Sequence, residues 1–319
     1  MSKKILITRR IPDAAENLLK KNGFEVLIGS DERGLSKKEL MELGKDADGI
    51  ISMLSDKFDG SVLKKLKKCK VIANYAVGYN NIDLKAAKEM GIKVTNTPDI
   101  LTDATADIAM GLAIAAARNF VVGDKLVRDG KFEGWKPLLL LGPEFRGKTF
   151  GIIGAGRIGQ ATARRAAAFG SKIIYFNRSK KYDFEKELNA KKVSLNKLLT
   201  ISDFISLHLP LTDKTYHILN ADNMKNLKEG VIIVNTARGE VIDEKELIKL
   251  LKKRKVFAAG LDVYENEPQV KKAFLKMDNV ILLPHIGTAT FEARTKMAEL
   301  TAKNIINILK GKPAITPVF

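Results

Sequence analysis

The stretch GIIGAGRIGQ, residues 151–160, constrains the fold more than any other part of the chain. Its Gly154, Gly156 and Gly159 have the G-x-G-x-x-G spacing, follow an apolar strand-like run and precede the helix-like segment QATARRAAAFG. A strand, a glycine turn and a helix in this order are typical of a dinucleotide-binding βαβ unit. The three glycines allow a tight turn, close approach of the backbone to a pyrophosphate, and close packing of helix on strand. The context therefore favours a dinucleotide site over an ordinary glycine-rich turn.

Short β-branched runs alternate with longer helix-period segments along the whole chain, which is the pattern of parallel α/β architecture. The first series of expected strands is KILITR, EVLIG, GIISM, VIANY and KVTNT, with amphipathic segments at 14–20 and 61–68. The second series is KTFGIIGAG, KIIYFN, FISLHL, VIIVNT, VFAAGLDV and NVILLP. We therefore expect an α/β fold with two doubly wound parallel sheets.

Two further segments are predicted to be helical. LTDATADIAMGLAIAAARNF, residues 101–120, lies between the two strand series and indicates one long Ala-rich helix with Thr102 or Asp103 as its N-cap. A loop containing Gly134, Trp135 and Pro137 follows it. FEARTKMAELTAKNIINILKG, residues 291–311, predicts a helix at the end of the chain.

The composition narrows the class of protein. Of 319 residues, 45% are hydrophobic and 29% charged, which is an ordinary globular balance. The single cysteine, Cys69, fits a reducing compartment, and the longest apolar stretch, 108–117, is about half of a membrane span. The N-terminus has no cleavable apolar segment. We expect a soluble cytoplasmic protein that has neither a membrane partner nor a metal site.

The net charge of +18 could suggest a nucleic-acid partner. However, the lysines are spread along the chain, often beside acids, and no helix-turn-helix or zinc signature is present. We therefore expect no nucleic-acid partner, although the charge can raise the local concentration of anionic substrates and cofactors.

The strand after the glycine turn, KIIYFN, ends at Asn177, where NAD sites usually place a carboxylate for the ribose. Asn177 removes the repulsion that such an acid would exert on the 2′-phosphate of NADP. Arg178 can bind a phosphate in a bidentate way, and Ser179 adds a hydroxyl donor. The alternative is a basic surface loop. We expect NADP(H) to be preferred and NAD(H) to be accepted less well.

Reduction of a carbonyl by a nicotinamide cofactor also needs a proton donor, and the chain has three histidines. His285, in ILLPHIGTAT, follows an expected strand, at the sheet edge where ligands gather. His208, in ISLHLPL, can contact the nucleotide but has no nearby carboxylate in the sequence. His217, in TYHILN, is interpreted as a packing or surface residue. His285 is therefore the predicted acid.

Two more strand ends carry charged side chains. VIIVNTARGE places Arg238 where its guanidinium could bind a substrate carboxylate in a bidentate fork. GLDVYENEP places Asp262, Glu265 and Glu267 after the next strand, and a carboxylate bonded to His285 would favour the imidazolium. These residues alone do not distinguish Glu265 from Glu267.

The motifs GIIGAGRIGQ, NTARGEVIDE, GLDVYENEP and LPHIGTAT, in this order, resemble those of the D-2-hydroxyacid dehydrogenase family. AVGYNNIDLKAA and WKPLLLLGPEFRGKTFGIIG match it too, so the resemblance covers essentially the whole chain. The WKP segment and the NRS strand end are most similar to the glyoxylate/hydroxypyruvate reductase and 2-ketogluconate reductase branch. The resemblance implies NADPH-dependent reduction of a small 2-keto acid to the D-2-hydroxy acid.

The resemblance also implies site residues. Arg238 would bind the substrate carboxylate and polarise the keto group, Glu267 would partner His285, and His285 would donate the proton. Val77 and Gly78 would hold the carboxylate through backbone N–H groups, Leu54 would line the pocket, and Trp135 would either reach a neighbouring subunit's site or be buried at a dimer interface. The implied cofactor contacts are Thr105, Gly154, Gly156, Arg157, Ile158, Gly159, Asn177, Arg178, Ser179, Pro210, Thr236, Asp262, His285 and Gly287.

The family pattern further implies a flavodoxin-like substrate domain, residues 1–99 completed by 289–319, and a Rossmann cofactor domain, residues 100–288, with a cleft between them. Hinges near 97–98 and 284–288 would close that cleft around the hydride. The Ala-rich helix and the loop after it would form the contact of a homodimer.

Other members of the same fold are alternatives. A nucleotide-sensing corepressor could keep the three site residues, but this chain has no extra docking or disordered segment. A D-lactate dehydrogenase remains an alternative within the enzyme class. A 3-phosphoglycerate dehydrogenase is less expected because the chain stops at Phe319, and a formate dehydrogenase because its pattern lacks the partner that Glu267 supplies.

Overall fold

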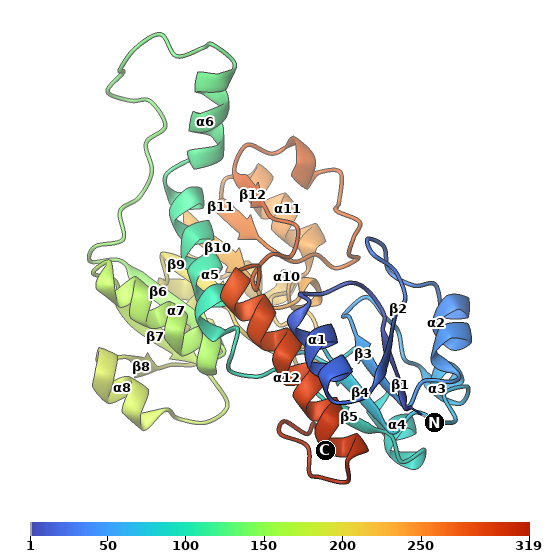
Figure 1. The fold of residues 1–319 in the computed structure, drawn as a ribbon. Coiled ribbons are helices and arrows are strands. Elements are labelled where there is room, and N and C mark those ends of the chain that lie inside the picture. The colour runs from blue at the N-terminus through green and yellow to red at the C-terminus, as the bar shows by residue number, and fades with distance from the viewer. Residues whose placement is uncertain (1) are drawn as a thin grey trace. The chain divides into compact units, whose positions relative to one another are not determined.

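The computed structural model describes residues 2–319, which form two compact units. The first unit runs to Leu101 and resumes at Thr288, and the second is Thr102–Gly287. Both are built from a parallel sheet with helices, as predicted (Figure 1).

The first unit contains a five-stranded parallel sheet in the order β2-β1-β3-β4-β5. This order is that of flavodoxin-like folds. The last helix of the chain returns to this sheet and packs on the first helix and on the third and fourth strands. The strands are β1 (Lys4–Ile7), β2 (Glu25–Ile28), β3 (Gly49–Ser52), β4 (Val71–Asn74) and β5 (Lys93–Thr95), and the helices are α1 (Ala14–Lys21), α2 (Lys37–Gly44), α3 (Gly60–Leu63), α4 (Leu84–Glu89) and α12 (Phe291–Leu309).

The second unit contains a seven-stranded parallel sheet in the order β12-β11-β10-β9-β6-β7-β8. The strand order reverses between β6 and β9, which is where doubly wound sheets bind their ligands. The strands are β6 (Thr149–Ile153), β7 (Lys172–Phe176), β8 (Lys191–Lys192), β9 (Phe204–Leu207), β10 (Val231–Asn235), β11 (Val256–Leu261) and β12 (Val280–Leu282). The helices are α5 (Thr102–Ala117), α6 (Phe120–Arg128), α7 (Arg157–Ala168), α8 (Tyr182–Leu188), α9 (Leu195–Ile201), α10 (Ala221–Met224) and α11 (Glu244–Lys252), with 3-10 turns η1 (Gly239–Val241) and η2 (Phe274–Lys276).

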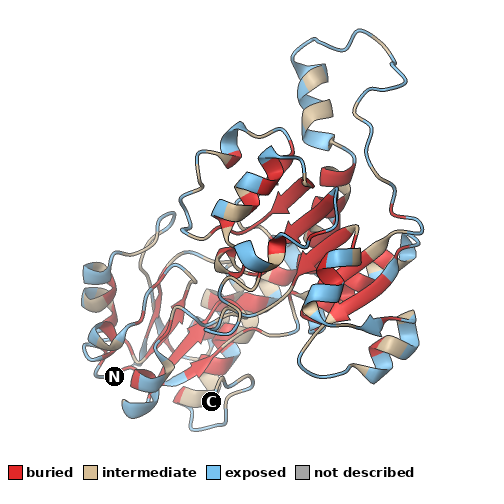
Figure 2. Ribbon diagram, turned by 180° about the vertical axis from the view of Figure 1, so that it is seen from behind, coloured by how far each residue is buried: buried red, intermediate tan, exposed pale blue. Residues whose placement is uncertain are grey.

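The central strands of this sheet are buried on both faces, which explains their continuous apolar runs. Along β10, Ile232 and Val234 belong to the core under α5 and α7, whereas Val231 and Ile233 belong to the core on the opposite face. Figure 2 shows the strands of this sheet mostly buried. The two covered faces leave the strand ends as the surface on which a site can form.

The Ala-rich segment differs from its prediction as one helix over 101–120. Helix α5 ends at Ala117, Asn119 adopts a left-handed conformation (φ 52°), and α6 starts at Phe120 with a bend of 64° between the two axes. The chain returns close to this break, because a Cβ on Gly142 would lie 1.8 Å from the carbonyl oxygen of Ala117. Thr102 is the first residue of α5, so neither Thr102 nor Asp103 is a cap outside the helix.

Within residues 2–319, no single helix is long and apolar enough to cross a membrane. Helices α5 and α6, counted together across their bend, have the length and apolar composition of a membrane span. Helix α5 packs on α7, β10 and β11, and nine of its residues are buried.

Candidate active site

The turn between β6 and α7 has the shape that a phosphate group requires. Gly154 has a φ of 97°, and a Cβ there would lie 2.5 Å from the carbonyl oxygen of His208. A Cβ on Gly159 would lie 2.1 Å from the carbonyl oxygen of Gly154, whereas a Cβ on Gly156 would meet nothing within 4 Å. Helix α7 begins at Arg157, so its N-terminal N–H groups and positive dipole end lie at this turn. The open space beside Gly156 fits a pyrophosphate, and half-buried Ile158 occupies the first turn of the helix.

The loop after β7 is basic and is held by hydrogen bonds among its own residues and with the end of the strand. Asn177 donates from Nδ2 to the carbonyl oxygen of Ser179 at 3.0 Å. The side chains of Arg178 and Ser179 are exposed. Beneath them, the buried Tyr175 hydroxyl accepts a hydrogen bond from the Lys181 N–H at 2.8 Å and lies 2.9 Å from Glu185 Oε1. The loop therefore presents a cation and a hydroxyl at the strand end, with no carboxylate at position 177.

His285 and Glu267 form a hydrogen-bonded pair. Nδ1 of His285, just after β12, lies 2.8 Å from Oε2 of Glu267, and both side chains are about one-third exposed. The other carboxylate oxygen of Glu267 accepts a hydrogen bond from the Tyr264 N–H at 3.0 Å. Burial acts to raise the pKa of Glu267, but the hydrogen bond and charge of His285 outweigh it and hold this pKa below its ordinary value. The ionised carboxylate can accept a hydrogen bond from the Nδ1–H of the ring.

Arg238 follows β10 and lies within the electrostatic field of Glu267. Burial lowers the pKa of Arg238 from its ordinary value, while the charges of Glu267 and Glu240 raise it. The carbonyl oxygen of Arg238 accepts a hydrogen bond from Asn235 Nδ2 at 2.8 Å, and its Nη1 donates to the Ala237 carbonyl oxygen at 2.6 Å. The strand end thus carries a partly desolvated cation beside the His–Glu pair.

Asp262, which is buried after β11, holds the loop that carries His285. Its carboxylate accepts hydrogen bonds from the Ile286 and Gly287 N–H groups, each at 2.7 Å. Burial raises the pKa of Asp262, against the effect of these bonds and of the charge on His285. A Cβ on Gly287 would lie 3.0 Å from Asp262 Oδ2 and 3.4 Å from Thr105 Cγ2. Glycine at 287 therefore lets Asp262, Thr105 and the His285 loop pack together.

Two buried hydroxyls in the second unit have no hydrogen-bond partner within the described chain. They belong to Thr105, near the start of α5, and to Thr236, directly after β10. Buried polar atoms are normally paired. An amide-bearing ring could supply the missing partner, so these hydroxyls fit the carboxamide of a nicotinamide.

The other two histidines have different surroundings. His208 Nε2 lies 2.8 Å from Ser206 Oγ, and burial lowers the pKa of His208 to about 3, so its ring is neutral at neutral pH. Nearby Pro210 is exposed, and its carbonyl oxygen accepts a bond from Thr215. His217, which was predicted to be a packing or surface residue, has a side chain that is 27% exposed and lies 2.8 Å from Glu265 Oε1. The two acids left open by the sequence thus have different histidine partners.

In the first unit, the loops after β3 and β4 carry the predicted substrate residues Leu54, Val77 and Gly78, all half-buried. Amides fix the second loop, because Asn96 Nδ2 donates to the Val77 carbonyl oxygen at 2.8 Å and Asn74 Nδ2 donates to that of Gly78 at 2.7 Å.

The loop after β3 is fixed in a similar way. Asp56 accepts a hydrogen bond from the Met53 N–H at 2.7 Å, and Asn81 donates to the Met53 carbonyl oxygen at 3.1 Å. The sequence reasoning missed these asparagines and this aspartate. They could have been found in the sequence as polar residues that lie at or shortly after the ends of apolar strands.

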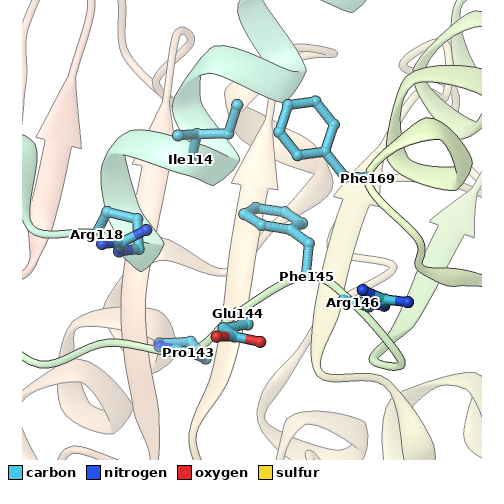
Figure 3. Close-up of a pocket in the computed structure, with 7 residues that line it drawn as sticks. All are labelled: Ile114, Arg118, Pro143, Glu144, Phe145, Arg146 and Phe169. Carbon is cyan, nitrogen blue, oxygen red and sulfur yellow. The ribbon is translucent and has the colours of Figure 1, made fainter.

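A hollow of about 300 Å³ lies at the other edge of the second sheet. Figure 3 shows Arg118, Glu144, Phe145, Arg146 and Phe169 around it. Residues 143–146 precede β6 and Phe169 precedes β7, so the hollow is at the amino ends of the strands. The residues described above follow the carboxyl ends, so the hollow is not part of their site.

The comparison with protein families decides the classification. Residues 110–287 match the model of the D-isomer specific 2-hydroxyacid dehydrogenase, NAD binding domain. The chain belongs to the D-isomer-specific 2-hydroxyacid dehydrogenases.

Relatives and solved structures agree with this assignment. The dehydrogenase is 47% identical to the glyoxylate reductase of Pyrococcus furiosus over 316 residues, 98% of this chain and 94% of that one. It resembles the crystal structure of a glyoxylate reductase from Paecilomyes thermophila with a TM-score of 0.87 and 39% identity, over 99% of this chain and 98% of the other. It also resembles an NADPH-dependent glyoxylate/hydroxypyruvate reductase from Sinorhizobium meliloti, in complex with NADP and malonate, with a TM-score of 0.88 and 32% identity, over 100% and 97% of the two chains.

These comparisons make the dehydrogenase an oxidoreductase that uses a nicotinamide cofactor and acts on 2-keto and 2-hydroxy acids. They favour an enzyme over the corepressor-like alternative, because the relatives described above are reductases.

Proposed function

We propose that this dehydrogenase reduces glyoxylate, hydroxypyruvate or 2-ketogluconate with NADPH, giving the D-2-hydroxy acid wherever the product is chiral. The observation that carries the proposal is the His285–Glu267 pair at 2.8 Å, with Arg238 in the field of the same carboxylate. The acid follows β12, the cation that can bind a carboxylate follows β10, and Glu267 follows the strand between them, β11. This arrangement suits a substrate with adjacent keto and carboxylate groups.

In the proposed mechanism, Arg238 binds the substrate carboxylate and polarises the keto oxygen. In the first unit, the proposed substrate residues are Val77 and Gly78, through their backbone N–H groups, and Leu54. When bound, the reduced nicotinamide supplies a hydride to the keto carbon. His285, with Nδ1 held by Glu267, gives a proton from Nε2 to the keto oxygen, so that one hydride and one proton complete the alcohol.

The second unit is the proposed cofactor domain. Gly154, Gly156 and Gly159 shape the pyrophosphate turn, where Arg157 adds positive charge and Ile158 packs in the first turn of α7. Thr105, Thr236, Asp262, Pro210 and Gly287 would surround the nicotinamide half, which the unpaired threonine hydroxyls support.

NADP(H) is the proposed preference, with NAD(H) accepted less well. Asn177 brings no negative charge to the strand end, and the exposed side chains of Arg178 and Ser179 would bind a 2′-phosphate. The NADP complex of the Sinorhizobium meliloti relative supports this preference.

We also propose a homodimer formed through the arm, residues 118–142, which comprises α6 and the loop after it. Figure 1 shows the arm extending from the seven-stranded sheet, and α6 has no buried residue. Its exposed apolar side chains are Phe120, Val121, Val127, Phe132, Trp135, Leu138, Leu139 and Leu141. An apolar surface of this kind is typical of a protein contact, and a second copy would cover it.

The test is a steady-state assay of glyoxylate, hydroxypyruvate, pyruvate and 2-ketogluconate with each nicotinamide cofactor. We expect NADPH with glyoxylate or hydroxypyruvate to give the highest kcat/KM. A higher kcat/KM for pyruvate with NADH would instead indicate a D-lactate dehydrogenase, and the absence of turnover with all four acids would contradict the proposed substrates.

A further inference from the structure

A second histidine–carboxylate pair lies beside the proposed catalytic one. His217 Nε2 is 2.8 Å from Glu265 Oε1, and Lys271 Nζ is 2.8 Å from Glu244 Oε2 and also contacts Glu265. The Glu265 N–H donates to Glu244 Oε1 at 3.0 Å. The Glu244 side chain is only 4% exposed and that of Glu265 15% exposed. We call His217, Glu244, Glu265 and Lys271 the ionic cluster.

The ionic cluster ties together three segments that are distant in the sequence. His217 comes from the loop after β9, Glu244 is the first residue of α11, and Glu265 and Lys271 come from the loop between β11 and β12. Its buried carboxylates need cationic or hydrogen-bonding partners, because an unpaired buried charge is strongly destabilising. The cluster therefore holds these segments in one arrangement.

One of these segments adjoins Arg238. The His217 N–H donates to the Glu240 carbonyl oxygen at 2.8 Å, and the Leu219 N–H donates to that of Val241 at 3.1 Å. The turn η1, which begins directly after Arg238, is thus bonded to the His217 loop.

The same turn packs against the loop that carries Glu267. A Cβ on Gly239 would lie 1.8 Å from the backbone carbon of Tyr264 and 2.1 Å from the Glu265 nitrogen. Two residues later, Glu267 accepts its bond from the Tyr264 N–H. A shift of Glu265 therefore displaces both the backbone beside Arg238 and the backbone that fixes Glu267.

We propose that His217 and Glu265 are positioning residues, which hold Arg238 and Glu267 in the geometry that reduction requires. The proposal rests on the function proposed above for Arg238 and Glu267. It assigns a role to a histidine that the mechanism does not use, and it separates the two neighbouring acids into a catalytic partner, Glu267, and a positioning one, Glu265.

The variants are His217→Leu, His217→Gln and Glu265→Gln. His217 has a φ of 44°, and Leu and Gln share the same backbone cost there, so they differ mainly in whether a side-chain donor for Glu265 is kept. Lys228→Met is the matched control, because Lys228 forms a 2.7 Å ion pair with Asp203 in the same unit, before β9 and β10 and so at the opposite sheet edge.

We expect kcat/KM for the keto acid to fall about tenfold to a hundredfold in His217→Leu and Glu265→Gln, through a higher KM and a lower kcat. The Kd of NADPH should stay within about twofold, because the cofactor's phosphates bind at the separate glycine turn. His217→Gln should recover part of the loss, and Lys228→Met should retain wild-type kinetics. A lower Tm with unchanged kcat/KM would overturn the positioning role.

Amide hydrogen exchange gives a readout that does not depend on substrate. Residues 237–242 and 263–268 should exchange faster in His217→Leu and Glu265→Gln, but not in Lys228→Met. Unchanged exchange in both segments would overturn the proposal even if activity falls. If the wild-type protein turned over no keto acid, the proposed function would fail, whereas the exchange result would still decide whether the cluster holds the two segments.

Discussion

The acid–base character of the proposed site depends on individual side chains. The carboxylate of Glu267 holds Nδ1 of His285, and Asp262 holds the backbone directly after it. Because the pKa of Glu267 lies below its ordinary value, this carboxylate remains charged throughout the neutral range. Its contribution to stability is present above the ordinary pKa and is lost as the pH falls through the lowered one.

Replacing Arg238 by alanine tests the carboxylate contact. We expect kcat/KM for glyoxylate to fall by about a hundredfold or more, because the substrate loses a partly desolvated charged partner. Arg238→Lys should recover only part of the loss, since lysine keeps the charge but not the bidentate fork. Near-normal kinetics in Arg238→Ala would mean that the substrate binds elsewhere.

The pH dependence of reduction tests the His285–Glu267 pair. The proposed mechanism needs the protonated imidazole of His285, so kcat/KM should decline as the pH rises from about 6 to about 10. In Glu267→Gln the profile should change, because Nδ1 of His285 no longer faces a charged carboxylate. An identical profile in both proteins would contradict the pairing, provided that a solvent isotope effect shows proton transfer to be rate-limiting.

Sequence reasoning located these side chains better than it located their partners. Apolar runs show where parallel strands end, so Arg238 and His285 could be assigned to one sheet edge before any coordinates. The sequence could not show which of Glu265 and Glu267 faces His285, because the backbone of the turn decides this. It could not show the partner of His217, since the hydrogen bond with Glu265 joins residues 48 positions apart.

At the scale of elements, β7 and the loop after it are proposed to determine the preference for NADP(H) over NAD(H). The hydroxyl of Tyr175 is hydrogen-bonded to the Lys181 N–H and to Glu185, and these bonds fix the loop. The side chains of Arg178 and Ser179 in this loop are exposed.

Arg178→Ala should raise the Kd of NADPH about tenfold or more and leave the Kd of NADH nearly unchanged, because only NADPH carries the 2′-phosphate. Lys172→Ala is the control, since Lys172 is an exposed cation at the other end of the same strand. Fluorescence titration measures both constants. Equal losses for the two cofactors would reduce this stretch to a basic surface loop.

Helices α5 and α6 show a limit of predicting helix boundaries from the hydrophobic pattern. The apolar pattern over 101–120 continues across the break at Asn119, because α5 and α6 are both compatible with it. At the break the chain returns through Gly142, close to Ala117, a contact between residues 25 positions apart that no local pattern encodes.

At the scale of the whole molecule, the arm predicts the state of assembly. Its exposed apolar side chains favour a dimer, and a stable dimer buries about 800 Å² on each partner. The double variant Phe132→Asp, Leu138→Asp should dissociate the dimer in sedimentation velocity. Leu275→Asp, which changes an exposed leucine in η2, should not. A wild-type monomer at micromolar concentration would contradict the proposed assembly.

The most direct test of the proposed reaction follows a labelled hydride. The protein is incubated with hydroxypyruvate and NADPH that carries deuterium at the transferable position, and the product is analysed by mass spectrometry and chiral chromatography. We predict D-glycerate with deuterium on C2 in the wild-type protein, and loss of most product in Arg238→Ala. Unlabelled glycerate, or the L-isomer, would contradict hydride transfer to a keto acid held as proposed.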